Sequence, residues 1–142
     1  MIYVDTSLLL PVYVPEGRSE EANGILEDAS AIVISDLAVA EFHVGLARKV
    51  KLGTLTIPQS ETARATFESH LSEGLVQRIA MSPSHSEAAG DLAWKSPVML
   101  RTLDALHLAV AAGLGAPVAT FDGRLAEAAR ALGFTVLPEL PG

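Results

Sequence analysis

The chain contains no cysteine and no apolar run that clearly suits a membrane span. The absence of cysteine excludes disulfides, zinc sites built from thiolates, and cysteine nucleophiles. The most apolar stretch, residues 105–121, includes His107, a Gly-Leu-Gly break and Pro117, and it barely reaches the roughly 20 apolar residues that a spanning helix requires. The first five residues have no basic segment and include Asp5, unlike a signal peptide. We therefore expect a cytoplasmic protein with no membrane association.

Basic residues are also scarce, since 10 lysines and arginines oppose 17 acids and the net charge is −7. Non-specific nucleic-acid binding normally needs a basic surface, and this total argues against it. A nuclease is still compatible with the charge, because a carboxylate cluster that holds divalent cations adds to the negative total and is neutralised in use. An acidic surface that only aids solubility would also explain most of the imbalance.

The 142 residues fit one domain of common size, and 49% of them are apolar. With 19% charged residues, a disordered chain is not a serious alternative. We find no repeat, low-complexity segment or linker, so the sequence predicts a single domain over residues 1–142.

Short apolar segments alternate with helical patterns along the chain. Alternation of this kind predicts right-handed crossovers and an α/β fold whose parallel sheet is covered on both faces. Short, uniformly apolar strands suit such a buried sheet. Ser35 can cap the helix after it, Gly53 can close that helix, and Thr102 can cap a later one. The expected strands are 2–5, 31–34, 75–80, 117–121 and 134–137; the expected helices are 18–28, 36–50, 58–71, 83–95, 102–114 and 124–132.

Four carboxylates stand out by their positions. Asp5 and Asp122 each follow an expected strand, at the sheet edge where α/β proteins bind ligands. Glu41 interrupts the apolar stripe of its helix, and burial of an acid there is costly unless it is paired or bound to metal. Asp104 lies in the first turn of its helix. If the four acids converge, they need a cation to stay ionised together, and such oxygen ligands select Mg²⁺ or Mn²⁺ over zinc.

Each acid also has a purely structural explanation. Asp104 can complement the dipole of its helix, Asp5 can cap a helix that begins at Thr6 and Ser7, and Asp122 can form a turn with Gly123. Glu41 can be exposed if its helix is rotated from the expected orientation. Any one acid is therefore a weak signal, and the argument depends on all four in this order.

The acids lie in short motifs whose order and intervals resemble those of PIN-domain nucleases over the whole chain. In length and spacing the chain looks like the VapC-type toxins of bacterial and archaeal toxin–antitoxin pairs. The motifs are Val4-Asp5-Thr6-Ser7, Ala40-Glu41 in a mid-chain helix, Thr102-Leu103-Asp104-Ala105, and Thr120-Phe121-Asp122 before a short helix.

The resemblance implies a three-layer α/β/α domain with strand order 3-2-1-4-5 and Mg²⁺-dependent endonucleolytic cleavage of RNA, with Mn²⁺ as a substitute. It also implies a homodimer and an inhibitory antitoxin partner. By position, the four acids match the catalytic, metal-binding quartet of the family: Asp5, Glu41, Asp104 and Asp122. The expected mechanism is hydrolysis by metal-activated water, with no covalent nucleophile.

Three hydroxyls are expected to support this quartet. Thr120 matches a conserved hydroxyl of the family, and Thr6 or Ser7 can supply another near the metal. Ser7 has no evident histidine partner, so a serine hydrolase is rejected. Gly123-Arg124 stands where relatives place another acid, which leaves open whether a second metal binds without substrate.

The histidines are expected to be structural. His107 shares a helix face with Asp104 and could bind metal, but we favour a hydrogen-bonded, half-buried histidine in these apolar surroundings. His43 should point away from Glu41, because residues two apart do not face one another on a helix.

Among the cations, Arg124 beside Asp122 is the best candidate for a phosphate contact. The basic residues Arg48, Lys49 and Lys51 suit a helix C-terminus, and we favour that over contact with RNA. Trp94 is expected to pack rather than to stack on a base.

Other functional classes fit less well. A doubly wound phosphoacceptor domain needs its reactive Asp on a middle strand, but the strand 75–80 ends in Met81-Ser82. A haloacid-dehalogenase phosphatase needs Asp-x-Asp after the first strand, and Asp5-Thr6-Ser7 lacks the second acid. A non-toxin PIN nuclease of RNA processing and a non-catalytic PIN binding module remain the alternatives, although binding modules usually lose acids. A DNA substrate also stays open, since the carboxylate chemistry is the same.

Overall fold

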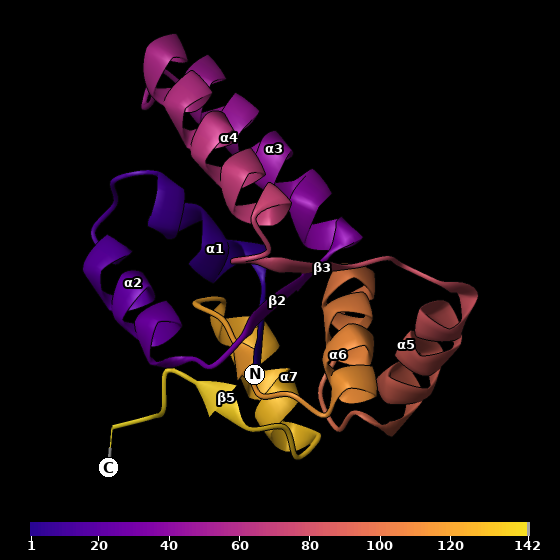
Figure 1. Cartoon of the computed structure of the whole chain (residues 1–142). Helices are drawn as coiled ribbons and strands as arrows, with labels where there is room; N and C mark the ends of the chain where they lie inside the picture. Colours follow the sequence, from indigo (N-terminus) through magenta and orange to yellow (C-terminus); the bar gives the residue numbers. More distant parts are fainter. Residues whose placement is uncertain (142) are drawn as a thin grey trace.

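Five parallel strands form the centre of the computed structural model, which describes residues 1–141. The sheet order is β3-β2-β1-β4-β5, as the resemblance implied (Figure 1). The expected domain ends at Gly142, which lies outside the described residues. The strands are β1 (Ile2–Val4), β2 (Ile32–Ser35), β3 (Gln77–Ile79), β4 (Val118–Ala119) and β5 (Val136–Leu137).

Seven helices connect these strands within residues 1–141. Every expected helix is present, with bounds within two residues of the prediction, and two of them have the predicted bounds. Gly53 follows α3 with φ 78°, the left-handed conformation that ends helices. The helices are α1 (Thr6–Tyr13), α2 (Ser19–Asp28), α3 (Asp36–Lys51), α4 (Ile57–Ser72), α5 (Pro83–Lys95), α6 (Thr102–Leu114) and α7 (Gly123–Ala131).

The helices cover the sheet in two layers. Successive residues of β1 point to opposite faces, so Val4 joins a core with Leu8 and Phe42, whereas Tyr3 joins a core with Leu108 and Leu125. Helices α1 to α4 therefore lie on one face, and α6 and α7 lie on the other with α5 packed against α6. Figure 1 shows α3 and α4 extending together beyond the sheet.

Three local predictions were wrong. The strand β3 is not a buried apolar strand, since Gln77 and Arg78 are exposed at the edge of the sheet. Arg101 holds the N-cap position of α6, and Thr102 is its first helical residue. The short helix α1 is missing from the expected helices and was considered only as the structural alternative for Asp5, because its run of leucines around Pro11 shows no helical period.

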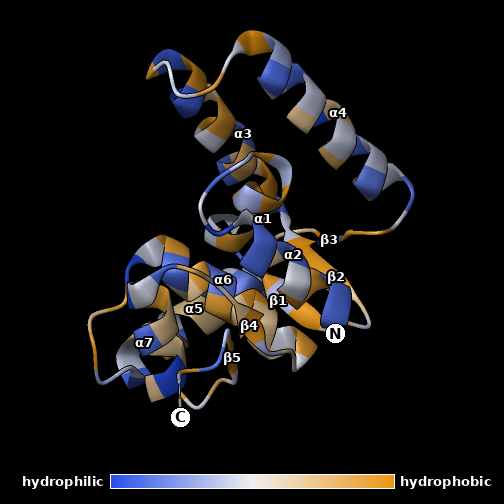
Figure 2. Ribbon diagram, turned by 90° about the vertical axis from the view of Figure 1, so that its left-hand side faces the viewer, coloured by the Kyte–Doolittle hydropathy of each residue, from blue (hydrophilic) through white to orange (hydrophobic). Residues whose placement is uncertain are grey.

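The hydropathy of the strands and helices agrees with a central sheet that helices cover. In Figure 2 the ribbon of β1 and β2 is mainly orange, whereas the helices carry mixed colours. In the part of the chain that the structure describes, no helix has both the length and the apolar character needed to span a bilayer.

Candidate active site

The four predicted acids come from elements that meet at one edge of the sheet. Asp5 and Asp122 directly follow β1 and β4, and parallel strands end at the same edge. Because α6 leads into β4, its first turn, which carries Asp104, lies at this edge as well. Glu41 reaches the same region from α3, through contacts with Thr6 and with α6. We refer to Asp5, Glu41, Asp104 and Asp122 as the acidic site.

Asp5 is a buried carboxylate, with 5% of its surface exposed. Ser7 Oγ donates a hydrogen bond of 2.8 Å to its Oδ1. Burial raises the pKa of Asp5 to about 6, despite the opposing effects of the Ser7 hydrogen bond and of His107. Asp5 occupies the N-cap position of α1, where the backbone N–H of Leu8 is one of the groups that act to lower its pKa. Its strongest side-chain hydrogen bond is the one from Ser7, so capping is only part of its environment.

Ser7 and Thr120 connect the beginning of α1 to the end of β4. Their hydroxyl oxygens lie 3.1 Å apart, so that one donates to the other. The backbone N–H of Phe121 donates to Ser7 Oγ at 2.9 Å, and that of Asp122 donates to Thr120 Oγ1 at 3.0 Å. The two hydroxyls thus hold the segments that carry Asp5 and Asp122 against each other.

Glu41 is held by two side chains. Thr6 Oγ1 donates to Glu41 Oε1 at 3.0 Å, and His107 Nε2 lies 2.6 Å from the same oxygen. Because an ionised carboxylate can only accept, Nε2 is the donor. Burial acts to raise the pKa of Glu41, but the hydrogen bond and charge of His107, together with Thr6, hold this pKa below its usual value.

His107 belongs to a buried chain of hydrogen bonds that the sequence did not predict. Its Nδ1 lies 2.5 Å from the Tyr3 hydroxyl, which lies 2.8 Å from Ser35 Oγ. Which of Nδ1 and the Tyr3 hydroxyl donates depends on the proton carried by the ring, and in either case the chain runs from Ser35 through Tyr3 and His107 to Glu41. The expected hydrogen-bonded histidine is confirmed, but it is buried, with 3% exposed, rather than half-buried. The shared face of Asp104 and His107 was the only signal for it in the sequence.

Asp104 experiences the other acids directly. Burial is the largest cause that raises the pKa of Asp104, and the negative charges of Asp122 and Glu41 raise it further. Arg101 and His107 act in the opposite direction and lower it. Asp122 accepts from the backbone N–H groups of Arg124 at 2.9 Å and Leu125 at 3.4 Å, both through Oδ1. Asp122 therefore caps α7, whereas its structural alternative was a turn with Gly123, and it also contributes negative charge to the acidic site.

The chemistry of this donor set fits a hard divalent cation. Buried and mutually repelling carboxylates are stabilised by positive charge, and carboxylate oxygen is the ligand that Mg²⁺ prefers. Over residues 1–141, however, no three acidic or histidine side chains are grouped closely enough to hold a metal ion as they stand. Ion binding at the acidic site therefore requires its carboxylates to approach one another.

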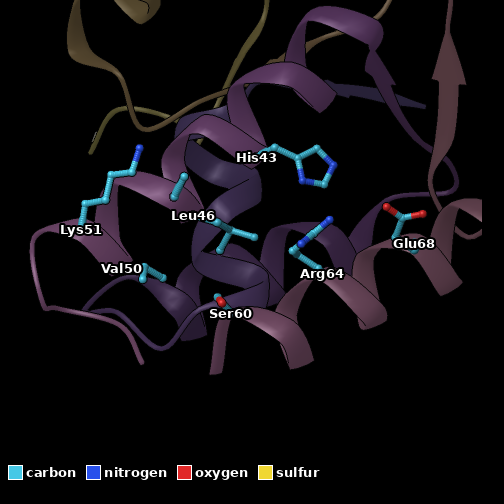
Figure 3. A pocket seen from close by; sticks show the side chains of 8 residues that line it. His43, Leu46, Val50, Lys51, Ser60, Arg64 and Glu68 are labelled. Atoms are coloured by element: carbon cyan, nitrogen blue, oxygen red, sulfur yellow. The ribbon is translucent and has the colours of Figure 1, made fainter. Parts of the chain in front are cut away.

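Other residues singled out in the sequence lie elsewhere. Trp94 is 92% exposed, so the expectation that it packs was wrong. Lys49 forms an ion pair with Glu16. His43 packs against the Phe67 ring and lines a hollow of about 500 Å³ between α3 and α4, where Figure 3 shows it with Arg64. This hollow contains no residue of the acidic site.

Comparisons with known proteins agree with the fold. The model of the PIN domain family matches residues 2–131. Ribonuclease VapC46 of Mycobacterium tuberculosis is 32% identical over 139 residues, which cover 96% of this chain and 95% of that protein. Mycobacterium tuberculosis VapC20, described as a Sarcin-Ricin loop cleaving toxin, superposes with a TM-score of 0.70 at 18% identity, covering 95% of this chain and 97% of that one. A chain of a toxin-antitoxin complex from Klebsiella pneumoniae also reaches 0.70 at 19% identity, covering 99% and 100%.

Proposed function

The chain belongs to the PIN domain family and to its VapC branch, and we propose that it is a metal-dependent endoribonuclease that hydrolyses RNA phosphodiester bonds at the acidic site. The observation that carries the proposal is the burial of Asp5, whose pKa is raised to about 6, beside Ser7 and Thr120. Such a buried carboxylate is costly for folding, and perturbed acids of this kind cluster at functional sites.

Asp5, Glu41, Asp104 and Asp122 would hold the cation, which we propose to be Mg²⁺, with Mn²⁺ as a substitute. A bound divalent ion supplies a Lewis acid that stabilises charge developing on the phosphodiester. The chain's own contribution is orientation: Ser7 fixes the carboxylate of Asp5, and Thr6 and His107 fix that of Glu41. Arg124, close to Asp122 in the sequence, would contact a phosphate of the substrate.

We further propose that the protein is the toxin of a toxin–antitoxin pair, acts in the cytoplasm and forms a homodimer. The Klebsiella pneumoniae neighbour is described as part of a toxin-antitoxin complex. The acidic site has a net negative charge that a basic side chain of an antitoxin would neutralise, in place of the metal. Co-purification with the product of an adjacent reading frame tests the partner. Inhibition that survives charge reversal of every basic residue in the tail of that product would contradict this mode of neutralisation.

A cleavage assay on total RNA tests the enzymatic proposal. We expect cleavage with Mg²⁺ or Mn²⁺, none with chelator, and none by Asp5→Asn or Asp104→Asn, because the amide keeps the shape and loses the charge of a metal ligand. Asp91→Asn is the matched control, since Asp91 is an exposed acid on α5. Cleavage by either site variant at the wild-type rate would overturn its assignment. RNA binding without cleavage by the wild type would indicate a binding module instead.

A further inference from the structure

A second hollow, of about 310 Å³, lies beside the acidic site. Asp122 belongs to both places, and Thr120, which also lines the hollow, bonds to Ser7 beside Asp5, so this hollow adjoins the region where the phosphodiester would bind. Its other walls come from the beginning of α2, from α7 and from the C-terminal segment: Arg18, Phe121, Arg130 and residues 138–141.

Arg18 forms one wall of this hollow with a fixed, planar group. Its guanidinium carbon lies 3.6 Å from the centre of the Phe121 ring. Glu21 accepts two hydrogen bonds along the guanidinium edge, from Nε at 2.9 Å and from Nη2 at 3.0 Å. The ring and the carboxylate together restrict both the position and the plane of the guanidinium. The Arg18 side chain is nevertheless 49% exposed, which leaves surface for a ligand.

The chemistry of this wall favours a nucleobase over a phosphate. Glu21 already neutralises the positive charge of Arg18 and occupies its Nε–Nη2 edge, which leaves only the Nη1 side of the guanidinium free to bind a phosphate. The flat face of the guanidinium remains available for stacking when Glu21 neutralises its charge. Unpaired bases stack on such arginine faces. Phe121 on one face of the guanidinium and a base on the other would form a three-layer stack.

Hydrogen bonds connect this wall to the acidic site. The backbone N–H of Phe121 donates to Ser7 Oγ at 2.9 Å, and Ser7 donates to Asp5. A base that stacks on Arg18 would therefore belong to a nucleotide close to the phosphodiester at Asp5 and Asp122. We propose that Arg18, backed by Phe121, is a stacking platform for one unpaired nucleobase of the RNA strand next to the scissile bond. This inference rests on the proposed function and names a residue that positions its substrate.

The test uses an oligoribonucleotide with one mapped cleavage site, and copies of it with a single abasic residue at each position near that site. For the wild type, we expect one abasic position next to the cut to raise KM on the order of tenfold, as loss of one base stack does. Arg18→Ala should raise KM of the intact substrate by a similar factor with kcat unchanged, and the abasic residue should then have no further effect. Arg18→Lys should behave as Arg18→Ala, because the plane is lost although the charge remains.

Two further variants separate stacking from charge and from general weakening. Glu21→Ala should raise KM less than Arg18→Ala, because it loosens the guanidinium without removing it. Arg48→Ala, on the exposed surface of α3, removes the same charge and should leave KM unchanged. Full activity of Arg18→Lys, or an unchanged KM in Arg18→Ala, would overturn the platform while the nuclease function stands.

A binding measurement keeps the inference testable if the wild type cuts no RNA. In that case the proposed function fails, and titration with adenosine 5′-monophosphate followed by NMR examines the platform alone. We expect shifts of the Phe121 ring resonances in the wild type and in Arg48→Ala, but not in Arg18→Ala. Absence of these shifts in the wild type would overturn the platform as well.

Discussion

At the scale of single residues, burial sets the behaviour of Asp5. Its pKa of about 6 lies above the usual aspartate value of 3.8, so the folded protein binds the proton more tightly than the unfolded chain does. Between these two values the folded state carries more protons, and the free energy of unfolding therefore falls as the pH rises. Above pH 6 the folded protein buries an ionised carboxylate, and the full free-energy cost of that burial reduces the free energy of unfolding.

The first prediction concerns Asp5→Asn in the metal-free protein. The amide has no charge to bury, so this variant should lose the fall in stability between about pH 4 and pH 6. At pH 8 it should be more stable than the wild type by about 3 kcal/mol, the free energy that corresponds to the difference between the two pKa values. Urea unfolding at pH 4.5 and pH 8 with chelator measures this difference. A variant less stable than the wild type at pH 8 would show that Asp5 is a structural residue.

The buried chain through His107 leads to a second prediction. Tyr3→Phe removes the hydroxyl between Ser35 and His107 and leaves buried polar atoms without a partner. We expect a loss of about 1–3 kcal/mol in unfolding free energy, and slower RNA cleavage because His107 then holds Glu41 less firmly.

Tyr13→Phe is the matched control for this change. The Tyr13 hydroxyl bonds to His70 Nδ1 at 2.7 Å in a partly buried place, where water can replace it. Tyr13→Phe should therefore lower the free energy of unfolding less than Tyr3→Phe does, and it should leave the rate of RNA cleavage unchanged. Equal effects of the two substitutions would mean that the buried chain has no special role in the acidic site.

At the scale of elements, the acidic site depends on how α1 begins and how β4 ends. Helix α1 presents Thr6 to Glu41 and Ser7 to Asp5 within its first two residues. The end of β4 presents Thr120 to Ser7. Hydroxyls from two elements that are distant in the sequence therefore determine where the carboxylates point.

The third prediction compares Thr120→Ala with Ser7→Ala. Thr120 makes two hydrogen bonds in this junction and orients groups without carrying charge, so its loss should slow cleavage about 10- to 100-fold. Ser7→Ala should slow it more, because Ser7 bonds to Asp5, Thr120 and the Phe121 backbone. RNA cleavage rates under saturating Mg²⁺ show which of the two substitutions slows the reaction more. Complete inactivity of Thr120→Ala, equal to that of Asp104→Asn, would contradict a purely orienting role.

At the scale of the whole molecule, folding itself assembles the acidic site. Its four carboxylates come from the beginning, middle and end of the chain and are far apart when the chain is unfolded. An ion that requires all four binds the folded state alone, and its binding free energy therefore adds to the stability of the fold.

The fourth prediction is a metal-dependent shift in thermal stability. At a free Mg²⁺ or Mn²⁺ concentration 100 times the Kd, the stabilisation is about 2.7 kcal/mol, which raises the Tm of a domain of this size by several degrees. Asp104→Asn should remove most of this shift, whereas Asp91→Asn should keep it. Melts at fixed ionic strength with metal or with chelator measure both. Equal wild-type Tm values under the two conditions would contradict a metal site.

The sequence by itself determined the order of elements, the α/β class and the strand order that the resemblance implied. The order of elements and the α/β class follow from local causes, because hydrophobic period, capping residues and glycines act over a few neighbouring residues. The strand order came from the family resemblance alone. The same short motifs indicated the four acids, and their role as metal ligands stays a prediction. Helices α5 and α6 were predicted to the residue because proline begins one and left-handed Gly115 ends the other.

Only the tertiary structure decided which side chains meet. Helix α1 forms from a run without helical period because Leu8 and Leu9 are both fully buried, so packing rather than pattern selects it. Tyr3 and His107 are separated by 104 positions, and their hydrogen bond exists only because β1 and α6 share a core. The contact of Arg18 with Phe121 likewise joins α2 to the end of β4. Such contacts depend on the relative placement of whole elements, and local sequence carries no signal for that placement.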